Sequence, residues 1–218
     1  MQTFPNGTVF SVATAMAAAI AISALTNADP GVASAATPPV EGDICVLQSG
    51  WPALNNRVVR ALDPTANSFK LEGFDTTSTT KYPAGAGTGS FQVASGWVPL
   101  SQVTSIAKSG GDQQFYQWQY AEDPTGNQQQ RPTYKNAKTL TLKLDYDPAL
   151  AWYDALDKAD EAKEAIVLRA VLPNGSILYY LVYPSFDADP SMDLNQNMGN
   201  TATFSLISKL TRYDAAAE

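Results

Sequence analysis

Alternating hydrophobic and polar residues along most of the chain predict strands rather than helices. Between Ser68 and Phe74, Phe69 and Leu71 face one way and the polar residues between them face the other. In Thr139–Leu144, three leucines alternate with threonine and lysine, which is the clearest strand pattern in the chain. Further strands are expected at Asp43–Leu47, Arg57–Leu62, Phe91–Ala94, Gln113–Tyr120, Ile166–Leu172, Ser176–Tyr183 and Thr201–Tyr213, whereas Met16–Leu25 fits a strand or a short helix. Gly96–Ser105 is expected as a strand or a connection.

One segment, Asp147–Ala165, follows the helical period instead. Asp147 is expected to cap this helix, and Pro148 occupies the first helical position, where its missing N–H costs nothing. Apolar residues recur at helical spacing, with charges on the remaining face: Ala149, Trp152, Tyr153, Leu156 and Ala159. The pattern predicts a helix that covers the outside of a sheet.

The connections are predicted from turn residues and small side chains. Pro173-Asn174-Gly175 predicts a hairpin between two hydrophobic strands. Met1–Ala13 is expected as an extended arm with a turn at Pro5–Gly7, and residues 214–218 as a frayed tail. The remaining connections are expected to be irregular: a linker at Ala33–Gly42, a polar turn at Asp123–Pro132 and an acidic loop at Asp187–Gly199.

The longest irregular segment is the loop Asp75–Gly89, rich in glycine and threonine. Loops of more than about 12–15 residues are uncommon in compact domains unless they are functional or disordered. Because this one joins well-patterned strands, we expect it to become ordered against another molecule. The residues expected to make that contact are Asp75, Thr76, Thr77, Lys81, Tyr82, Pro83, Gly85, Gly87 and Gly89.

Composition limits the classes of protein that fit. The 218 residues suit one domain, expected to span residues 1–218. Only 16% of the residues are charged, which favours a surface largely covered by neighbouring subunits. The net charge of −7 and the absence of a basic run argue against binding to nucleic-acid phosphates. The single cysteine, Cys45, lies in a predicted strand and is expected to be a small core residue.

The sequence carries no pattern typical of a catalytic or metal-binding site. The chain contains no histidine, which removes the commonest general base and most zinc sites. We therefore expect no catalytic residues, no metal and no cofactor. The apolar run Val12–Leu25 suggests a signal peptide, but no Lys or Arg precedes Arg57, and the run is too short to span a bilayer. We expect the N-terminus to be retained and the protein not to insert into a membrane.

Several segments in order resemble one protein family. GDICVLQSGWPALNNRVVRA, FKLEGFDTT, YPAGAGTGSFQV and GGDQQFYQWQY are similar to segments of the major tail tube proteins of long-tailed, non-contractile, siphovirus-type bacteriophages. The order of these segments agrees with the family from about Phe4 to Tyr213. No single motif carries the resemblance; the order and spacing of several together do.

The resemblance implies both a fold and a function. It implies a mainly β fold, a β-sandwich or half-barrel with one flanking helix, in which subunits form a hexameric ring with a central β-barrel lumen. The rings would stack on one another around a tape-measure protein, with tail-terminator and tail-tip proteins at the ends. The tube would form in the host bacterial cytoplasm, become part of the virion and pass DNA to the host without specific binding.

Within such a tube, each segment has an expected place. The loop Asp75–Gly89 would be disordered in the monomer and order between rings, the N-terminal arm would contact a neighbour, and the helix would lie on the outer wall. The expected lumen positions are Ser68, Lys70, Glu72 and Gln92. Either Glu72 offsets the charge of Lys70 or this face points elsewhere. Two alternatives stay open: an inner tube subunit of a contractile injection system, and a secreted β-sandwich binding module.

Overall fold

The computed structural model describes residues 4–214, which form a mainly β fold with one helix. This confirms the fold class predicted from the sequence. The elements in chain order are β1 (Val9–Met16), β2 (Ile20–Leu25), β3 (Val32–Ala35), β4 (Ile44–Ser49), β5 (Arg57–Leu62), β6 (Ser68–Leu71), β7 (Gly89–Leu100), β8 (Val103–Gly110), β9 (Gln113–Trp118), β10 (Gln129–Lys135), β11 (Lys138–Asp145), α1 (Ala151–Ala162), β12 (Ile166–Val171), β13 (Ile177–Ser191), β14 (Gly199–Leu206) and β15 (Thr211–Tyr213).

Six strands of the N-terminal half form a closed barrel. Their order is β2-β3-β6-β5-β4-β7, and pairing of β2 with β7 closes the ring. The interior is filled by inward-facing strand side chains such as Phe69 and Phe91 and by Trp51 from the β4–β5 connection, all 0% exposed. A six-stranded barrel is narrow enough for side chains to fill completely. It is therefore a packed core and not a channel.

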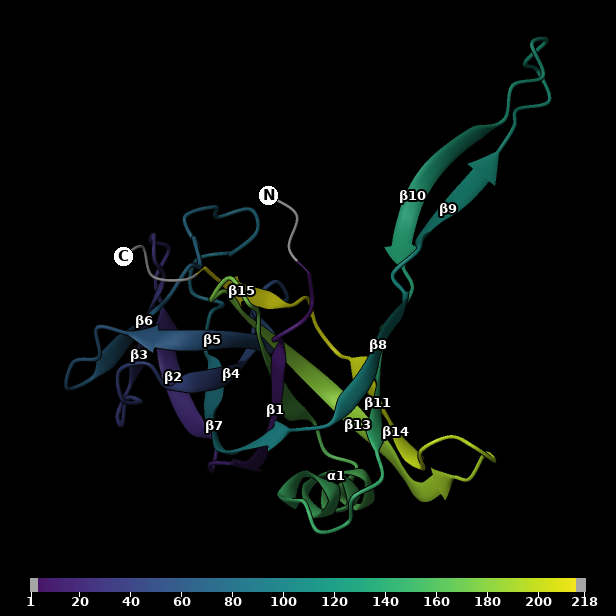
Figure 1. Ribbon diagram of the computed structural model, residues 1–218. Coiled ribbons are helices and arrows are strands. Elements are labelled where there is room, and N and C mark those ends of the chain that lie inside the picture. The colour runs from purple at the N-terminus through teal and green to yellow at the C-terminus, as the bar shows by residue number, and fades with distance from the viewer. Residues whose placement is uncertain (1–3, 215–218) are drawn as a thin grey trace.

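The C-terminal half is an open sheet covered by the helix. Strand β7 leaves the barrel and continues into the order β7-β1-β12-β13-β14-β11-β8 (Figure 1). It leaves at Gly96, whose φ of +67° favours glycine. A Cβ on Gly96 would lie only 2.4 Å from Thr14 Oγ1 on the paired strand β1. The course of β7 from the barrel into the sheet therefore requires glycine at position 96.

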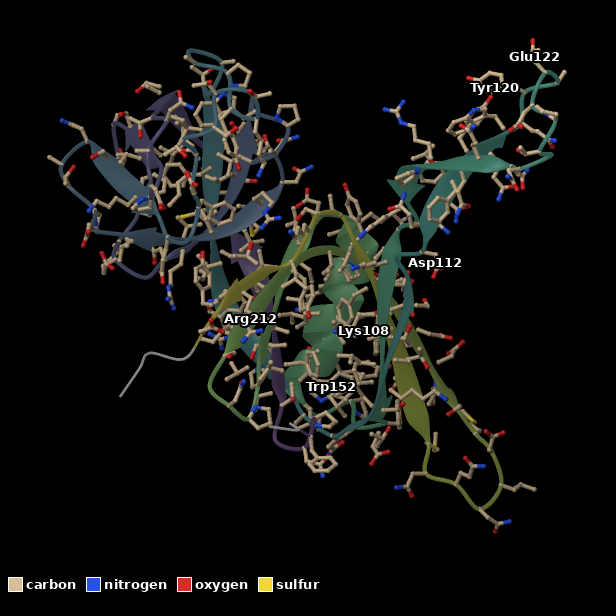
Figure 2. All side chains as sticks on the ribbon, turned by 90° about the horizontal axis from the view of Figure 1, so that it is seen from above. Lys108, Asp112, Tyr120, Glu122, Trp152 and Arg212 are labelled. Carbon is tan, nitrogen blue, oxygen red and sulfur yellow. The ribbon has the colours of Figure 1, made fainter. Side chains whose placement is uncertain are left out.

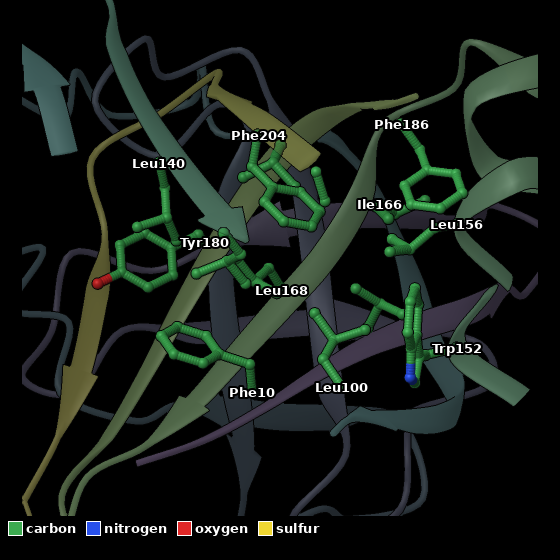
Figure 3. Packing of buried hydrophobic residues seen from close by; sticks show 14 of the residues in the cluster. Phe10, Leu100, Leu140, Trp152, Leu156, Ile166, Leu168, Tyr180, Phe186 and Phe204 are labelled. Carbon is green, nitrogen blue, oxygen red and sulfur yellow. The ribbon is translucent and has the colours of Figure 1, made fainter. Parts of the chain in front are cut away.

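The two faces of this sheet bury different clusters. On one face, Trp152 and Leu156 of α1 pack with strand residues such as Phe10, Leu168 and Phe204 (Figure 3). The opposite face packs against the outside of the barrel, through these residues: Ala13, Ile44, Val46, Val58, Ala94, Val167, Tyr179, Leu181 and Tyr213. Adjacent residues such as Val167 and Leu168 belong to different clusters, as the two-residue period of a strand requires. The layers are helix, sheet and barrel, in that order.

The boundaries of several elements differ from those predicted. The helix begins at Ala151, not at Asp147, because Asp147 Oδ1 accepts a hydrogen bond from the N–H of Ala149 in a preceding turn. Residues Val9–Ala13 are not an extended arm but part of β1, paired on both sides within the sheet. The turn at Pro5–Gly7 is confirmed by a 3.0 Å hydrogen bond from Thr8 N to Pro5 O. Residues 1–3 and 215–218 of the expected arm and tail lie outside the described part of the chain.

Three segments predicted as irregular are strands. They are Val32–Ala35 in the expected linker, Gln129–Pro132 in the expected polar turn, and Asp187–Ser191 in the expected acidic loop. Each is paired with a strand of strong pattern, for example β3 with β6 and β10 with β9. Pairing with a neighbouring strand outweighs weak local preference, because strand formation depends on context.

Candidate assembly interface

A two-stranded arm projects from the body of the protein. Strands β9 and β10 pair only with each other, as a separate sheet, and continue the direction of β8 and β11 (Figure 1). At its base, Gly110 and Gly111 have φ values of +74° and +87°. Figure 2 shows Tyr120 and Glu122 at the far end, away from the sheet and helix. The sequence indicated β9 but not the arm, because β10 lies in a segment that reads locally as a turn.

The arm presents aromatic side chains to solvent. Tyr116 and Tyr120 are 63% and 61% exposed, and Phe115 and Tyr134 are exposed as well. The Tyr116 and Trp118 rings stack with centroids 5.8 Å apart. An isolated hairpin is marginally stable in water, and clustered exposed apolar groups mark interaction sites. The arm is therefore the strongest candidate for a contact with another protein molecule.

The loop Asp75–Gly89 packs against the end of the barrel. The Thr76 hydroxyl, fully buried, lies 2.7 Å from Thr26 O and accepts a 3.1 Å hydrogen bond from Ala28 N. The amide of Asn27 donates to the carbonyl oxygens of Thr76 and Tyr82, at 2.9 and 2.8 Å. In this single chain the loop is packed on the barrel, and its disorder before assembly stays a prediction. Irregular backbone is held here by side chains of distant segments.

Trp51 anchors the second half of this loop. Its indole Nε1 donates to Pro83 O at 2.7 Å, and its ring lies 5.2 Å from that of Tyr82, centroid to centroid. Gly87 is buried against Trp51 and has no room for a side chain. Five of the loop residues predicted to contact another molecule are exposed: Asp75, Thr77, Lys81, Pro83 and Gly85. A contact between rings through these residues remains a prediction.

The four predicted lumen residues lie on or beside the outer surface of the barrel. Ser68 and Lys70 face outward from β6, and Gln92 from β7 donates to Ala17 O at 3.2 Å. Lys70 Nζ pairs with Asp63 Oδ2 at 2.8 Å, not with Glu72. Glu72 instead forms a two-pronged ion pair with Arg60. Pairing follows the register of β5 and β6, which the sequence pattern does not reveal.

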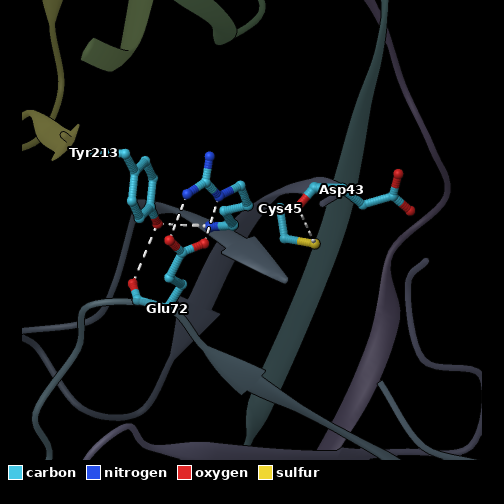
Figure 4. A network of polar contacts seen from close by, with 5 residues as sticks. Asp43, Cys45, Glu72 and Tyr213 are labelled. Atoms are coloured by element: carbon cyan, nitrogen blue, oxygen red, sulfur yellow. Dashed lines mark hydrogen bonds and ion pairs between the residues drawn. The ribbon is translucent and has the colours of Figure 1, made fainter. Parts of the chain in front are cut away.

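The Arg60–Glu72 pair belongs to a network that fastens the C-terminal strand to the barrel (Figure 4). Tyr213 of β15 accepts a 2.7 Å hydrogen bond from Arg60 N and donates to Glu72 O at 3.3 Å. The Arg60 guanidinium lies over the Tyr213 ring, 4.4 Å from its centroid. Burial raises the pKa of Tyr213 to about 12, and the hydrogen bond to Glu72 raises the pKa of Arg60. The barrel and sheet are thereby joined by a polar contact as well as by packing.

We expect Glu72→Lys to destabilise the fold by about 1–3 kcal/mol, because it leaves two cations facing each other in a half-buried site. Urea unfolding should show the loss as a lower midpoint. Glu72→Gln keeps one hydrogen bond to Arg60 and should cost less. Equal stability of the wild type and Glu72→Lys would show that the ion pair does not hold the C-terminal strand.

Within residues 4–214, the structure offers neither a metal site nor a bilayer-spanning helix. No group of three or more His, Cys, Asp or Glu side chains is placed to hold a metal ion in that range. The one helix there has 12 residues and is too short and too polar to cross a bilayer.

Comparison with known proteins gives one family match. The family model for the phage tail tube protein, TTP, matches residues 49–215. No curated protein matches the chain. Among solved structures, a chain from the virion of a native gene transfer agent particle has a TM-score of 0.42 at 10% identity, over 54% of this chain and 88% of that one. A chain from the anti-feeding prophage tube-terminating cap has a TM-score of 0.37 at 23% identity, over 52% and 80%.

A third similar structure comes from a contractile system. It is a chain of the sheath/tube terminator of an extracellular contractile injection system, with a TM-score of 0.37 and 18% identity, over 51% of this chain and 84% of that one.

Proposed function

Because this chain belongs to the phage tail tube protein family, we propose that its copies form hexameric rings that stack into the tail tube of a siphovirus-type phage. DNA would pass through that tube into the host. The tape-measure, terminator and tail-tip proteins implied by the resemblance would be its partners, and the host cytoplasm its place of assembly. The observation that carries self-assembly is the aromatic arm, which extends away from the body and pairs only with itself.

The position of the arm favours an open or ring-forming assembly. The arm lies on the opposite side of the molecule from the barrel in both overall views (Figures 1 and 2). A contact between one end of a subunit and a different surface of the next is heterologous. Such contacts generate closed rings or continuing filaments rather than two-fold dimers.

A channel for DNA in this assembly must be formed by several copies of the chain together. The barrel of a single chain is filled by buried aromatic and aliphatic side chains and has no passage. The lumen must therefore be a surface to which several subunits contribute. With a net charge of −7, a ring of subunits would repel DNA phosphates and let the duplex slide.

Negative-stain electron microscopy of the purified chain tests the proposal. We expect hollow tubes or stacked rings, formed without other phage proteins. Particles that carry the chain should have a tail without a contractile sheath. A chain that stays monomeric up to high concentration, under conditions in which it is folded, would contradict the proposal.

The proposed lumen positions are tested by adding positive charge. Ser68→Lys on the outer face of β6 should leave the tube intact and slow DNA ejection, because each ring would gain cations that attract phosphates. Ejection is measured by dye-labelled DNA release from particles. Ala162→Lys adds the same charge at the exposed end of α1 and should have no effect. Slow ejection with Ala162→Lys alone would place α1, not β6, at the lumen.

A further inference from the structure

A groove, defined here as two cavities that share wall residues, lies along the connection between β14 and β15. Two cavities, of about 650 and 490 Å³, share residues Ile207–Lys209 as a common wall. The first is lined by the end of the barrel, including Arg57, Phe74 and Lys81. The second reaches the base of the arm at Lys135 and Lys138. Four segments of the sequence line these two cavities: residues 52–57, 73–82, 135–138 and 206–210.

The groove is positively charged although the protein as a whole is acidic. Five basic residues line it: Arg57, Lys81, Lys135, Lys138 and Lys209. None of them forms an ion pair within residues 4–214, where the pairs are Arg60–Glu72, Lys70–Asp63 and Arg212–Asp214. One carboxylate, Asp75, lines the groove, and it accepts hydrogen bonds from the N–H and hydroxyl of Thr77. The groove is therefore suited to an acidic partner.

Arg57 is a basic residue of the groove whose guanidinium is only partly hydrogen-bonded. Its Nη2 reaches the Leu210 carbonyl oxygen and Thr211 Oγ1 at 3.4 Å each, and its guanidinium lies 5.1 Å from the Phe74 ring centroid. Its Nε is buried and has no hydrogen-bond partner within the described residues. Burial of the guanidinium lowers the pKa of Arg57. A carboxylate brought into the groove would stabilise this charge.

The tip of the arm has the matching chemistry. There, the exposed Tyr120 is followed by two adjacent carboxylates, Glu122 and Asp123. Asp123 Oδ1 accepts hydrogen bonds from the N–H and hydroxyl of Thr125, so Glu122 is the principal acidic group that the tip offers to a partner. An aromatic ring next to two acidic groups complements a groove that combines basic side chains with Phe74 and Tyr82. The arm tip is also remote from the barrel end of the groove in its own chain, because the arm extends to the opposite side (Figures 1 and 2).

We propose that the groove between the barrel and the β14–β15 connection binds the acidic arm tip, Tyr120–Asp123, of a second copy of this chain. The inference rests on the proposed self-assembly and identifies its receptor surface. Lys81 and Lys209 face the carboxylates of the partner's tip, and the aromatic lining accepts the tyrosine. Such charge pairs fix register and partner choice between subunits.

A pair of introduced cysteines tests the contact directly. In tubes oxidised with a mild oxidant, Glu122→Cys combined with Lys209→Cys should give covalent chains longer than a dimer on a non-reducing gel. Each single variant can give at most a dimer. The native Cys45 does not interfere, because it is buried and its thiol pKa is raised to about 12. The control pair is Glu161→Cys with Lys209→Cys. It places the first cysteine on α1 instead of on the arm tip and should give no ladder.

Charge reversal supplies a second readout. Lys81→Glu with Lys209→Glu should raise the concentration needed for tube formation at least tenfold, and so should Glu122→Lys with Asp123→Lys. Combining all four should restore assembly toward the wild-type level, which a general folding defect would not do. Lys158→Glu with Lys163→Glu on α1 is the control with the same charge change.

The outcomes separate this inference from the proposed function. If the wild type forms tubes but the cysteine pair gives no ladder and charge reversal has no effect, the groove assignment is overturned and tube formation stands. If the wild type forms no tubes, both are overturned.

Discussion

Removing the arm is expected to abolish tube formation and leave a folded monomer. The deletion takes out Gln113–Lys135 and joins Asp112 to Asn136. These ends already lie together, since Asn136 N donates to Asp112 O at 3.0 Å. The shortened chain would close β8 and β11 through a four-residue loop, a common hairpin length. All three hydrophobic clusters would remain intact, because arm residues belong to none of them.

Two measurements check the expected result. Electron microscopy and size-exclusion chromatography should show monomers at concentrations where the wild type forms tubes. Thermal unfolding should occur at the wild-type monomer temperature. A full-length control with Tyr116→Ser and Tyr120→Ser keeps the length of the arm and should also assemble poorly. Normal tubes from the deletion variant would show that the arm is not the assembly contact.

The largest expected effect on stability comes from Trp51→Ala. Trp51 is fully buried in the barrel core, contacts Tyr82 and donates a hydrogen bond to Pro83 O. Removing a buried aromatic side chain costs about 3–5 kcal/mol through lost burial and the remaining cavity. Here the substitution also detaches the loop Asp75–Gly89 from the barrel end. We expect a much lower urea midpoint and faster hydrogen exchange of the loop amides.

Trp51→Phe separates packing from the hydrogen bond. It keeps most of the ring and loses the indole N–H, so Pro83 O loses its donor, and the cost should be closer to about 1–2 kcal/mol. If Trp51→Ala leaves exchange in the loop unchanged while lowering stability, the loop is held by Thr76 and Asn27 alone. In that case the anchoring role assigned to Trp51 is wrong.

Local periodicity in the sequence was sufficient to predict which face of several strands and of the helix is buried. Phe69 and Leu71 alternate with polar neighbours, and the structure places both in the barrel core. The helical spacing of Trp152 and Leu156 likewise predicted a helix on a sheet, and both are buried there. Side-chain direction repeats every two residues in a strand and every 3.6 in a helix, so a short window fixes which face is buried. The ordered series of segments also sufficed to indicate the tail tube family.

The arrangement of these elements in space follows from contacts between residues that are distant in the sequence. Closure of the barrel depends on the pairing of β2 with β7. The ion pair between Glu72 and Arg60 depends on the register between β5 and β6. The arm exists because β10, weak in local pattern, pairs with β9, whereas the long loop is held by Trp51 and Asn27 from other segments. Each of these features rests on hydrogen bonds and packing between residues far apart in the chain. Local periodicity reports the face of an element but not its neighbour, which is why the arm and the basic groove emerge only from the folded molecule.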